Sequence, residues 1–162
     1  MYGSTLEEKT LLKKDRVAVK EQLFHLSVKA IIKNIQGDIL LLRRPHETKW
    51  DLPGGRINNN EQPNDALVRE IKEETGLTQL EHIQAHNIEF TPCTVISKRV
   101  DQENIKLLVW YYTCLSATTD VVLSDEHVES SWVPWSVARA KIVPLGQSVY
   151  IDQVVRCDDN RQ

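Results

Sequence analysis

The sequence predicts a mixed α/β domain of the α+β kind, in which one amphipathic helix lies between two groups of strands. Three observations lead to this prediction. Strand-like apolar runs recur along the chain, one segment at residues 63–75 is strongly helical, and proline and glycine fall between these segments. The chain has 162 residues, of which 41% are apolar and 27% charged, as is typical of one globular domain.

The strands expected before the helix begin with a hairpin. Residues 23–33 are β-branched and partly alternating, a turn containing Gly37 follows, and residues 39–43 return as the second strand. Residues 50–52 form a short extended segment, which the Pro-Gly-Gly sequence at 53–55 ends.

The central helix is expected over Pro63–Thr75. Pro63 suits the first helical turn, because its missing N–H would have no intrahelical partner there. Gly76 suits the left-handed position just past the helix end. Leu67 and Ile71 fall on one side and form an apolar stripe that faces a core.

More strands and helices are expected after this helix. The strands lie at 80–90, 93–100, 105–115 and 131–133, and the helices near 135–140 and 145–155. We therefore expect the folded domain over residues 23–157. Residues 1–22 are an N-terminal extension, either an irregular amphipathic helix or a partly ordered segment, and residues 158–162 are a frayed tail.

Charge and cysteine content narrow the function classes. The chain has 20 Lys+Arg and 23 Asp+Glu, and its net charge of −3 argues against a nucleic-acid binder with a broad basic face. Its three cysteines are widely spaced without a CxxC pair, which indicates a reducing compartment and neither a disulfide framework nor a zinc knuckle. The N-terminus does not have the pattern of a secretory signal, and the apolar runs are too short to cross a bilayer. We expect a cytoplasmic protein that binds neither membrane nor nucleic acid.

The helix carries an unusual cluster of carboxylates near its C-terminal end. At about 100° per residue, Glu70, Glu73 and Glu74 share an arc roughly 100° wide. Like charges at this spacing repel, and the helix macrodipole also disfavours anions at a C-terminus. Either the helix end is a solvated acidic surface, or a bound divalent cation offsets the cost. Oxygen ligands without a nearby cysteine select Mg²⁺ or Mn²⁺.

The neighbouring residues favour the cation. Gly54 and Gly55 let the backbone turn tightly and approach a ligand closely. Arg69 is adjacent to Glu70 and can hold a carboxylate through two parallel hydrogen bonds.

The full spacing resembles the Nudix box, G-x5-E-x7-R-E-U-x-E-E-x-G-U, where U is a bulky aliphatic residue. Every position matches, in the order Gly55, Glu61, Arg69, Glu70, Ile71, Glu73, Glu74, Gly76 and Leu77. The strands before and after the box also resemble the Nudix layout, so the resemblance covers residues 23–157.

The resemblance implies a Nudix-type α/β/α sandwich, with a mixed β-sheet between helices and a loop–helix–loop catalytic motif. It implies metal ligation by Glu70, Glu73, Glu74 and the carbonyl of Gly54. It further implies that Arg69 orients these glutamates, that Glu61 is structural or acts through water at the metal, and that Gly76 ends the helix.

Two further groups of candidate site residues lie outside the box. In this family the general base is a box glutamate or a residue on a later loop, and the loop Ser124-Asp125-Glu126-His127 resembles such a loop. We favour Glu126 as the base over Asp125 or Glu129. Arg43 and Arg44, at the end of the second strand, are candidates to bind substrate phosphates, the alternative being an exposed strand end.

The resemblance implies a Mg²⁺-dependent pyrophosphohydrolase that acts on a small nucleotide. The substrate is either a (deoxy)nucleoside triphosphate or a nucleoside diphosphate joined to another group, such as ADP-ribose. The spacing of Pro92 after the box resembles the ADP-ribose branch. The alternative is a catalytically silent sensor that binds a nucleotide on the same fold, although such proteins usually lose box carboxylates. A homodimer is expected by resemblance alone.

Overall fold

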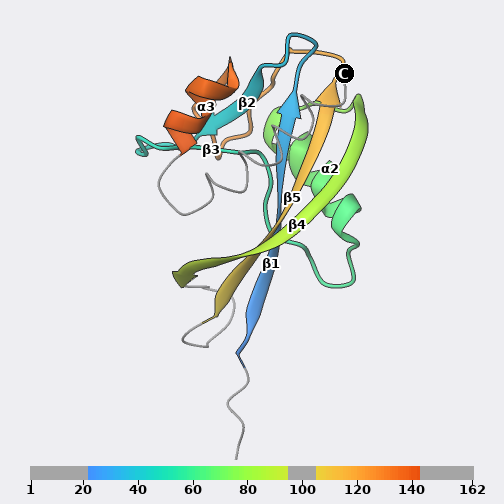
Figure 1. The fold of residues 1–162 in the computed structure, drawn as a ribbon, viewed down its shortest axis with the longest axis vertical. Coiled ribbons are helices and arrows are strands. Elements are labelled where there is room, and N and C mark those ends of the chain that lie inside the picture. The colour runs from blue at the N-terminus through green and yellow to red at the C-terminus, as the bar shows by residue number, and fades with distance from the viewer. Residues whose placement is uncertain (1–21, 95–104, 143–162) are drawn as a thin grey trace, which may run out of the picture.

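The computed structural model describes residues 22–94 and 105–142 (Figure 1). Its strands are β1 (Phe24–Lys33), β2 (Ile39–Arg43), β3 (Trp50–Asp51), β4 (Leu80–Thr94), β5 (Lys106–Ser116) and β6 (Glu129–Val133), and its helices are α2 (Pro63–Thr75) and α3 (Trp135–Ile142). The expectations for the N-terminal extension, the helix near 145–155 and the tail lie outside the described residues. Within the described part, no helix has the length and apolar character needed to span a membrane.

The strands form one mixed sheet, as expected. Their order is β3-β2-β1-β5-β4, and β6 pairs with β2 off this path. β1 and β5 are parallel, with Phe24 opposite Lys106, whereas the other pairs are antiparallel. The predicted hairpin is present, because Lys33 at the end of β1 pairs with Ile39 at the start of β2.

The two faces of the sheet bury separate apolar clusters. Successive side chains of a strand point to opposite faces. Ala30 and Ile32 therefore pack with Leu67 and Ile71 of α2, whereas Ile31 packs in the cluster that includes Ala138 of α3. One helix thus covers each face, in agreement with the expected α/β/α arrangement (Figure 1).

Helix α2 has the predicted bounds and caps. Pro63 is its first residue, and Gly76 follows its last residue with φ of 72°. The N–H of Gly76 donates to the carbonyl of Lys72 over 2.9 Å, which closes the last turn. Left-handed backbone of this kind favours glycine, because other residues bring Cβ too close to the chain.

The predicted break between strands at 80–90 and 93–100 is wrong, and residues 95–100 of the second strand lie outside the described residues. β4 runs without interruption from Leu80 to Thr94, through Pro92. β4 is the last strand in the sheet order, and among the described residues one of its sides makes no ladder, so the missing N–H of a proline is tolerated there. Register shifts along the β4–β5 pair absorb the irregularity.

Candidate active site

The site is built around the Pro-Gly-Gly turn that follows β3. This turn pairs with β1, because the amides of Ala30 and Val28 donate to the carbonyls of Pro53 and Gly55 over 2.8 and 2.9 Å. The carbonyl of Gly54, which lies between them, is not used in this pairing. Gly54 is buried, with φ of 130°, and a Cβ there would overlap the carbonyl oxygen of Val28. Only glycine fits this position.

Both glycines of the turn contact box carboxylates of α2. The N–H of Gly54 donates to Oε2 of Glu74 over 2.7 Å. The carboxylate of Glu70 lies so close to Gly55 that a Cβ there would be 2.5 Å from its Oε2. The two glycines thus let two carboxylates approach the backbone of the turn.

Arg69 connects three of the box glutamates. Nε and Nη2 donate to the two oxygens of Glu61 over 2.7 and 2.9 Å, while Nη1 donates to Glu70 over 2.8 Å and to Glu73 over 3.1 Å. The second Nη2 hydrogen bond reaches the carbonyl of Arg56 over 3.1 Å. These bonds use all five N–H donors of the guanidinium. The carboxylate that Arg69 holds through two parallel hydrogen bonds is that of Glu61, eight residues earlier, and not that of the adjacent Glu70.

Glu61 is ionised throughout the physiological range. The hydrogen bond from Arg69 and the backbone hydrogen bond from Asn58 lower the pKa of Glu61 to about 2. The partner carboxylates in turn raise the pKa of Arg69, so this cluster keeps its charges.

Glu74 has the opposite electrostatic character. Glu74 is only 6% exposed, and burial raises the pKa of its carboxyl to about 7. The charge of Lys29 and the hydrogen bond from the Gly54 amide act in the opposite direction and lower this pKa. Desolvation disfavours the charged form of a buried acid, so this group titrates near neutrality. A cation bound beside it would restore the ionised form.

The loop between β5 and β6 contacts the C-terminal end of α2. The amides of Val122 and Ser124 donate to the carbonyls of Thr75 and Glu74 over 2.9 and 3.4 Å. This loop places His127, which is buried, with Nε2 at 3.8 Å from Oε1 of Glu74. Burial and the nearby Arg44 and Lys29 lower the pKa of His127, so its imidazole is neutral at pH 7.

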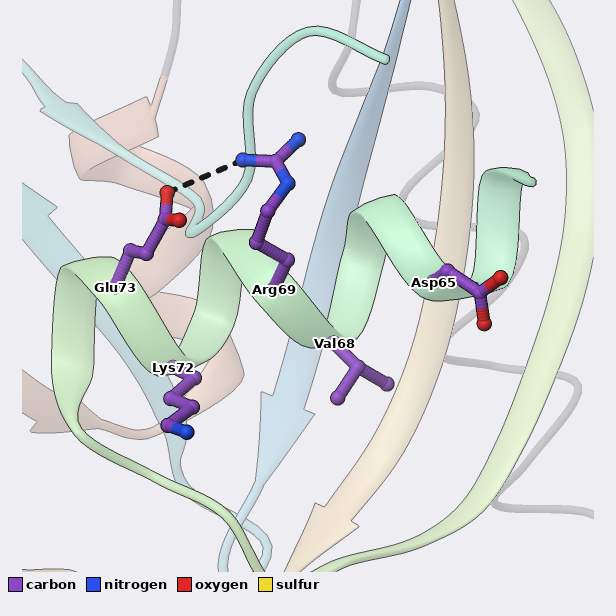
Figure 2. A pocket seen from close by; sticks show the side chains of 5 residues that line it. All are labelled: Asp65, Val68, Arg69, Lys72 and Glu73. Atoms are coloured by element: carbon purple, nitrogen blue, oxygen red, sulfur yellow. Dashed lines mark hydrogen bonds and ion pairs between the residues drawn. The ribbon is translucent and has the colours of Figure 1, made fainter. Parts of the chain in front are cut away.

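An open pocket of about 620 Å³ lies along α2 beside this cluster. Its lining residues are Asp65, Val68, Arg69, Lys72 and Glu73. Figure 2 shows Arg69 and Glu73 reaching toward each other on one side of the helix, with Lys72 on the other side.

A family comparison identifies the arrangement. The model of the NUDIX domain matches residues 23–153. The chain belongs to the NUDIX family. The resemblance of residues 55–77 to the Nudix box is thereby confirmed.

The chain is similar to named NUDIX proteins. Over 71 residues it is 38% identical to an RNA pyrophosphohydrolase of Pseudomonas syringae pv. syringae, and the match covers 44% of this chain and 41% of that relative. The chain thus matches less than half the length of the curated relatives. The crystal structure of a MutT protein from Methanosarcina mazei is 29% identical, with a TM-score of 0.66, over 88% of this chain and 99% of that one.

A third comparison shows the same fold at lower identity. The NUDIX domain of Shewanella oneidensis NrtR, solved in complex with ADP ribose, has a TM-score of 0.62 and 21% identity, over 93% of this chain and 97% of that one. The NUDIX-type sandwich expected from the sequence is therefore the fold of this chain.

The two site groups predicted outside the NUDIX box differ in their surroundings. Glu126 and Arg44 come together, because their side chains form an ion pair of 3.7 Å at the surface. Arg43 instead donates to Oε2 of Glu129 through Nε and Nη2, over 2.9 and 2.7 Å. The positive charge of Arg44 acts on Glu74 of the box, where it opposes the raised pKa of that carboxyl, whereas the guanidinium of Arg43 is held by Glu129.

Three residues near the box were not identified from the sequence. His127 contacts Glu74 as described above, and Lys29 of β1 donates to Oδ2 of Asp51 over 2.7 Å. Burial disfavours the ionised form of Asp51, but the Lys29 ammonium outweighs it and lowers the pKa of Asp51. A lysine between two apolar residues of a strand, at Val28-Lys29-Ala30, was the available signal.

The residues present fit a divalent cation in their chemistry. In each of the three α2 carboxylates one oxygen accepts a hydrogen bond, and the second oxygen accepts none that the structure describes. The glycine turn provides the space that a Cβ would fill. Among the residues that the structure describes, however, no three His, Cys, Asp or Glu side chains converge on one point as a ligand set. Binding therefore requires the glutamate side chains to turn.

Proposed function

We propose that this NUDIX protein is a Mg²⁺-dependent pyrophosphohydrolase that cleaves the pyrophosphate of a small nucleotide. The substrate class is a (deoxy)nucleoside triphosphate or a nucleoside diphosphate joined to a second group such as ADP-ribose. The observation that carries the proposal is the placement of Glu70 and Glu74 against Gly55 and Gly54. A helix with no ligand to bind would gain nothing from burying a carboxylate at this point.

Glu70, Glu73, Glu74 and the carbonyl of Gly54 are the proposed ligands of Mg²⁺, or of Mn²⁺ in its place. When bound, the cation neutralises the charge of the pyrophosphate oxygens and lowers the pKa of the attacking water. This donor set consists of hard oxygen atoms, which these two cations prefer.

The other residues of the site orient the carboxylates, accept a proton and contact the substrate. Arg69 holds Glu70 and Glu73 through one nitrogen, so the two carboxylates stay beside each other and can turn together toward a cation. We assign the acceptance of the proton of water to Glu126, whose exposed carboxylate lies 3.7 Å from the guanidinium of Arg44. Arg44 supplies positive charge for a phosphate oxygen of the substrate.

The names of the relatives support hydrolysis of a phosphoanhydride and differ in substrate. One relative is named an RNA pyrophosphohydrolase, and one neighbouring structure holds ADP ribose. Since the net charge of this chain is −3, we favour a small nucleotide over a polymer.

The test is a hydrolysis screen with Mg²⁺ or Mn²⁺ over nucleoside triphosphates, dinucleotides, nucleotide sugars and a 5′-triphosphorylated RNA oligonucleotide. Products are identified by mass spectrometry. Release of pyrophosphate or of a nucleoside monophosphate from a small nucleotide is the expected result. If only the RNA is cleaved, the proposed small-nucleotide substrate is wrong and the substrate is a 5′-triphosphorylated RNA. If a nucleotide binds but stays intact after long incubation, the result would instead support the alternative of a catalytically silent sensor.

A further inference from the structure

Lys29 is a largely buried cation in the middle of strand β1. Its side chain is 15% exposed, and its neighbours in the strand, Val28 and Ala30, belong to the apolar core. A charge in such a position is costly unless it is paired and hydrogen-bonded. Its ammonium donates to Oδ2 of Asp51 over 2.7 Å and to the carbonyl of Leu52 over 2.8 Å.

These two bonds fix the point where β3 ends. Asp51 is the last residue of β3, and its Oδ1 also accepts the N–H of Leu52 over 2.8 Å. The next residue begins the Pro-Gly-Gly turn. Lys29 therefore holds the chain just before the turn. At this point the chain stops pairing with β2 and begins to pair with β1.

The backbone of Lys29 packs against Gly54. A Cβ on Gly54 would be 3.0 Å from the Cα of Lys29. The residues on either side of Lys29 donate the amides that hold Pro53 and Gly55. The turn is thus held by Lys29 through its side chain and by its neighbours through their backbone.

We propose that Lys29, held by Asp51, is a positioning residue for Glu74. It keeps the Gly54 amide and carbonyl at the place where Glu74 and a bound cation need them. This inference rests on the proposed function. Residues that orient the ligands of a metal commonly change its affinity about 10- to 100-fold when they are removed.

The test uses the double substitution Lys29→Met and Asp51→Asn, which removes the ion pair and leaves the net charge unchanged. Lys49→Met, in the exposed loop before β3, is the matched control. Three quantities are compared with the wild type. They are hydrogen exchange of the Gly54 amide, Mn²⁺ affinity by calorimetry without nucleotide, and kcat and KM at saturating Mn²⁺.

In the double variant we expect faster exchange at Gly54, while the amide of Asn34, which donates to the carbonyl of Asp38 in the β1–β2 hairpin, keeps its protection. Mn²⁺ should bind about tenfold more weakly, and kcat should fall with little change in KM. A merely structural role would lower the protection of both amides together and leave the Mn²⁺ affinity of the folded protein unchanged. That result, or a double variant equal to the wild type, would overturn the inference.

The two proposals fail in different ways. If the wild type binds Mn²⁺ and cleaves a nucleotide, but the double variant does the same, only the role of Lys29 is wrong. If the wild type itself takes up no Mn²⁺, the proposed function fails, and the metal-positioning role of Lys29 fails with it.

Discussion

The backbone amide of Gly54 lies 2.7 Å from Oε2 of Glu74, twenty residues later in the chain. This bond joins the turn after β3 to the buried end of α2. It places a carboxyl whose pKa is about 7 against the glycine whose own carbonyl takes no part in the pairing of the turn with β1. The predictions below start from this contact and from its neighbours.

Replacing Glu74 by Gln should lower kcat by about two to three orders of magnitude while the fold is retained. The change removes one proposed ligand of a cation that, by neutralising charge, would contribute several kcal/mol in the transition state. Steady-state kinetics and circular dichroism measure the two effects. Glu81→Gln, an exposed carboxylate on β4, is the control and should behave as the wild type. Near-normal turnover of the Glu74 variant would contradict the ligand assignment.

Without divalent cation, the free energy of unfolding of the wild type should fall as pH rises. The pKa of Glu74 is raised from 4.5 to about 7 in the folded chain. The folded state therefore binds the extra proton between these values, and stability is lost as pH increases through this window, by roughly 3 kcal/mol. Urea unfolding in EDTA at pH 5.5 and 8 measures about 2 kcal/mol of this loss, because the rest occurs below pH 5.5. The Gln variant should lack it, and an equal slope in both proteins would refute the assignment.

Substitutions of the two adjacent glycines should separate stability from activity. An added Cβ at Gly55 meets the flexible end of Glu70, whereas one at Gly54 meets the backbone of Val28. Gly55→Ala should therefore displace the Glu70 carboxylate and lower kcat, with a melting temperature close to that of the wild type. Gly54→Ala should lower the melting temperature itself. Thermal melts and kinetics decide, and the reverse pattern would show that the turn is arranged differently.

Arg69→Lys should lower kcat about 10- to 100-fold, because a lysine cannot supply five donors in a planar fork. Glu70 and Glu73 would then lose their shared partner. Arg56→Lys is the control, since Arg56 contributes only a backbone carbonyl to this cluster. Mn²⁺ affinity measured alongside kcat should fall in the Arg69 variant alone.

The two arginines at the end of β2 should differ in their effect on KM. Arg44→Gln should raise KM for the nucleotide, because the charge of Arg44 acts on Glu74 of the box and Arg44 pairs only weakly with exposed Glu126. Arg43→Gln should leave KM nearly unchanged and cost at most about 1 kcal/mol of stability, as exposed ion pairs do. Equal changes in KM would assign both arginines to substrate binding.

Local signals in the sequence predicted most elements near the site. The bounds of α2 follow from Pro63 and Gly76, which act within one helical turn. The strand β4 was divided wrongly, because Pro92 reads as a break unless the strand is known to lie at a sheet edge. Edge position depends on tertiary pairing, which the local sequence does not contain.

The site could be predicted only as far as the box extends. Its carboxylates are close in sequence and fall on one helix face. Lys29 and Asp51 meet across 22 positions, and His127 reaches Glu74 from a different loop, so no periodicity links them. Even within the box, the two parallel hydrogen bonds from Arg69 to Glu61 depend on how the loop before α2 folds back.

The sequence places three acidic side chains where the helix dipole is negative, and the loop between β5 and β6 satisfies carbonyls there that a basic side chain would otherwise cap. The last carbonyls of α2 receive hydrogen bonds from the uncharged amides of Val122 and Ser124. Hydrogen bonds between neutral groups are insensitive to ionic strength, whereas an arginine or lysine cap would weaken in concentrated salt. The contacts between this loop and the acidic end of α2 should therefore be equally strong in dilute and in saline solution.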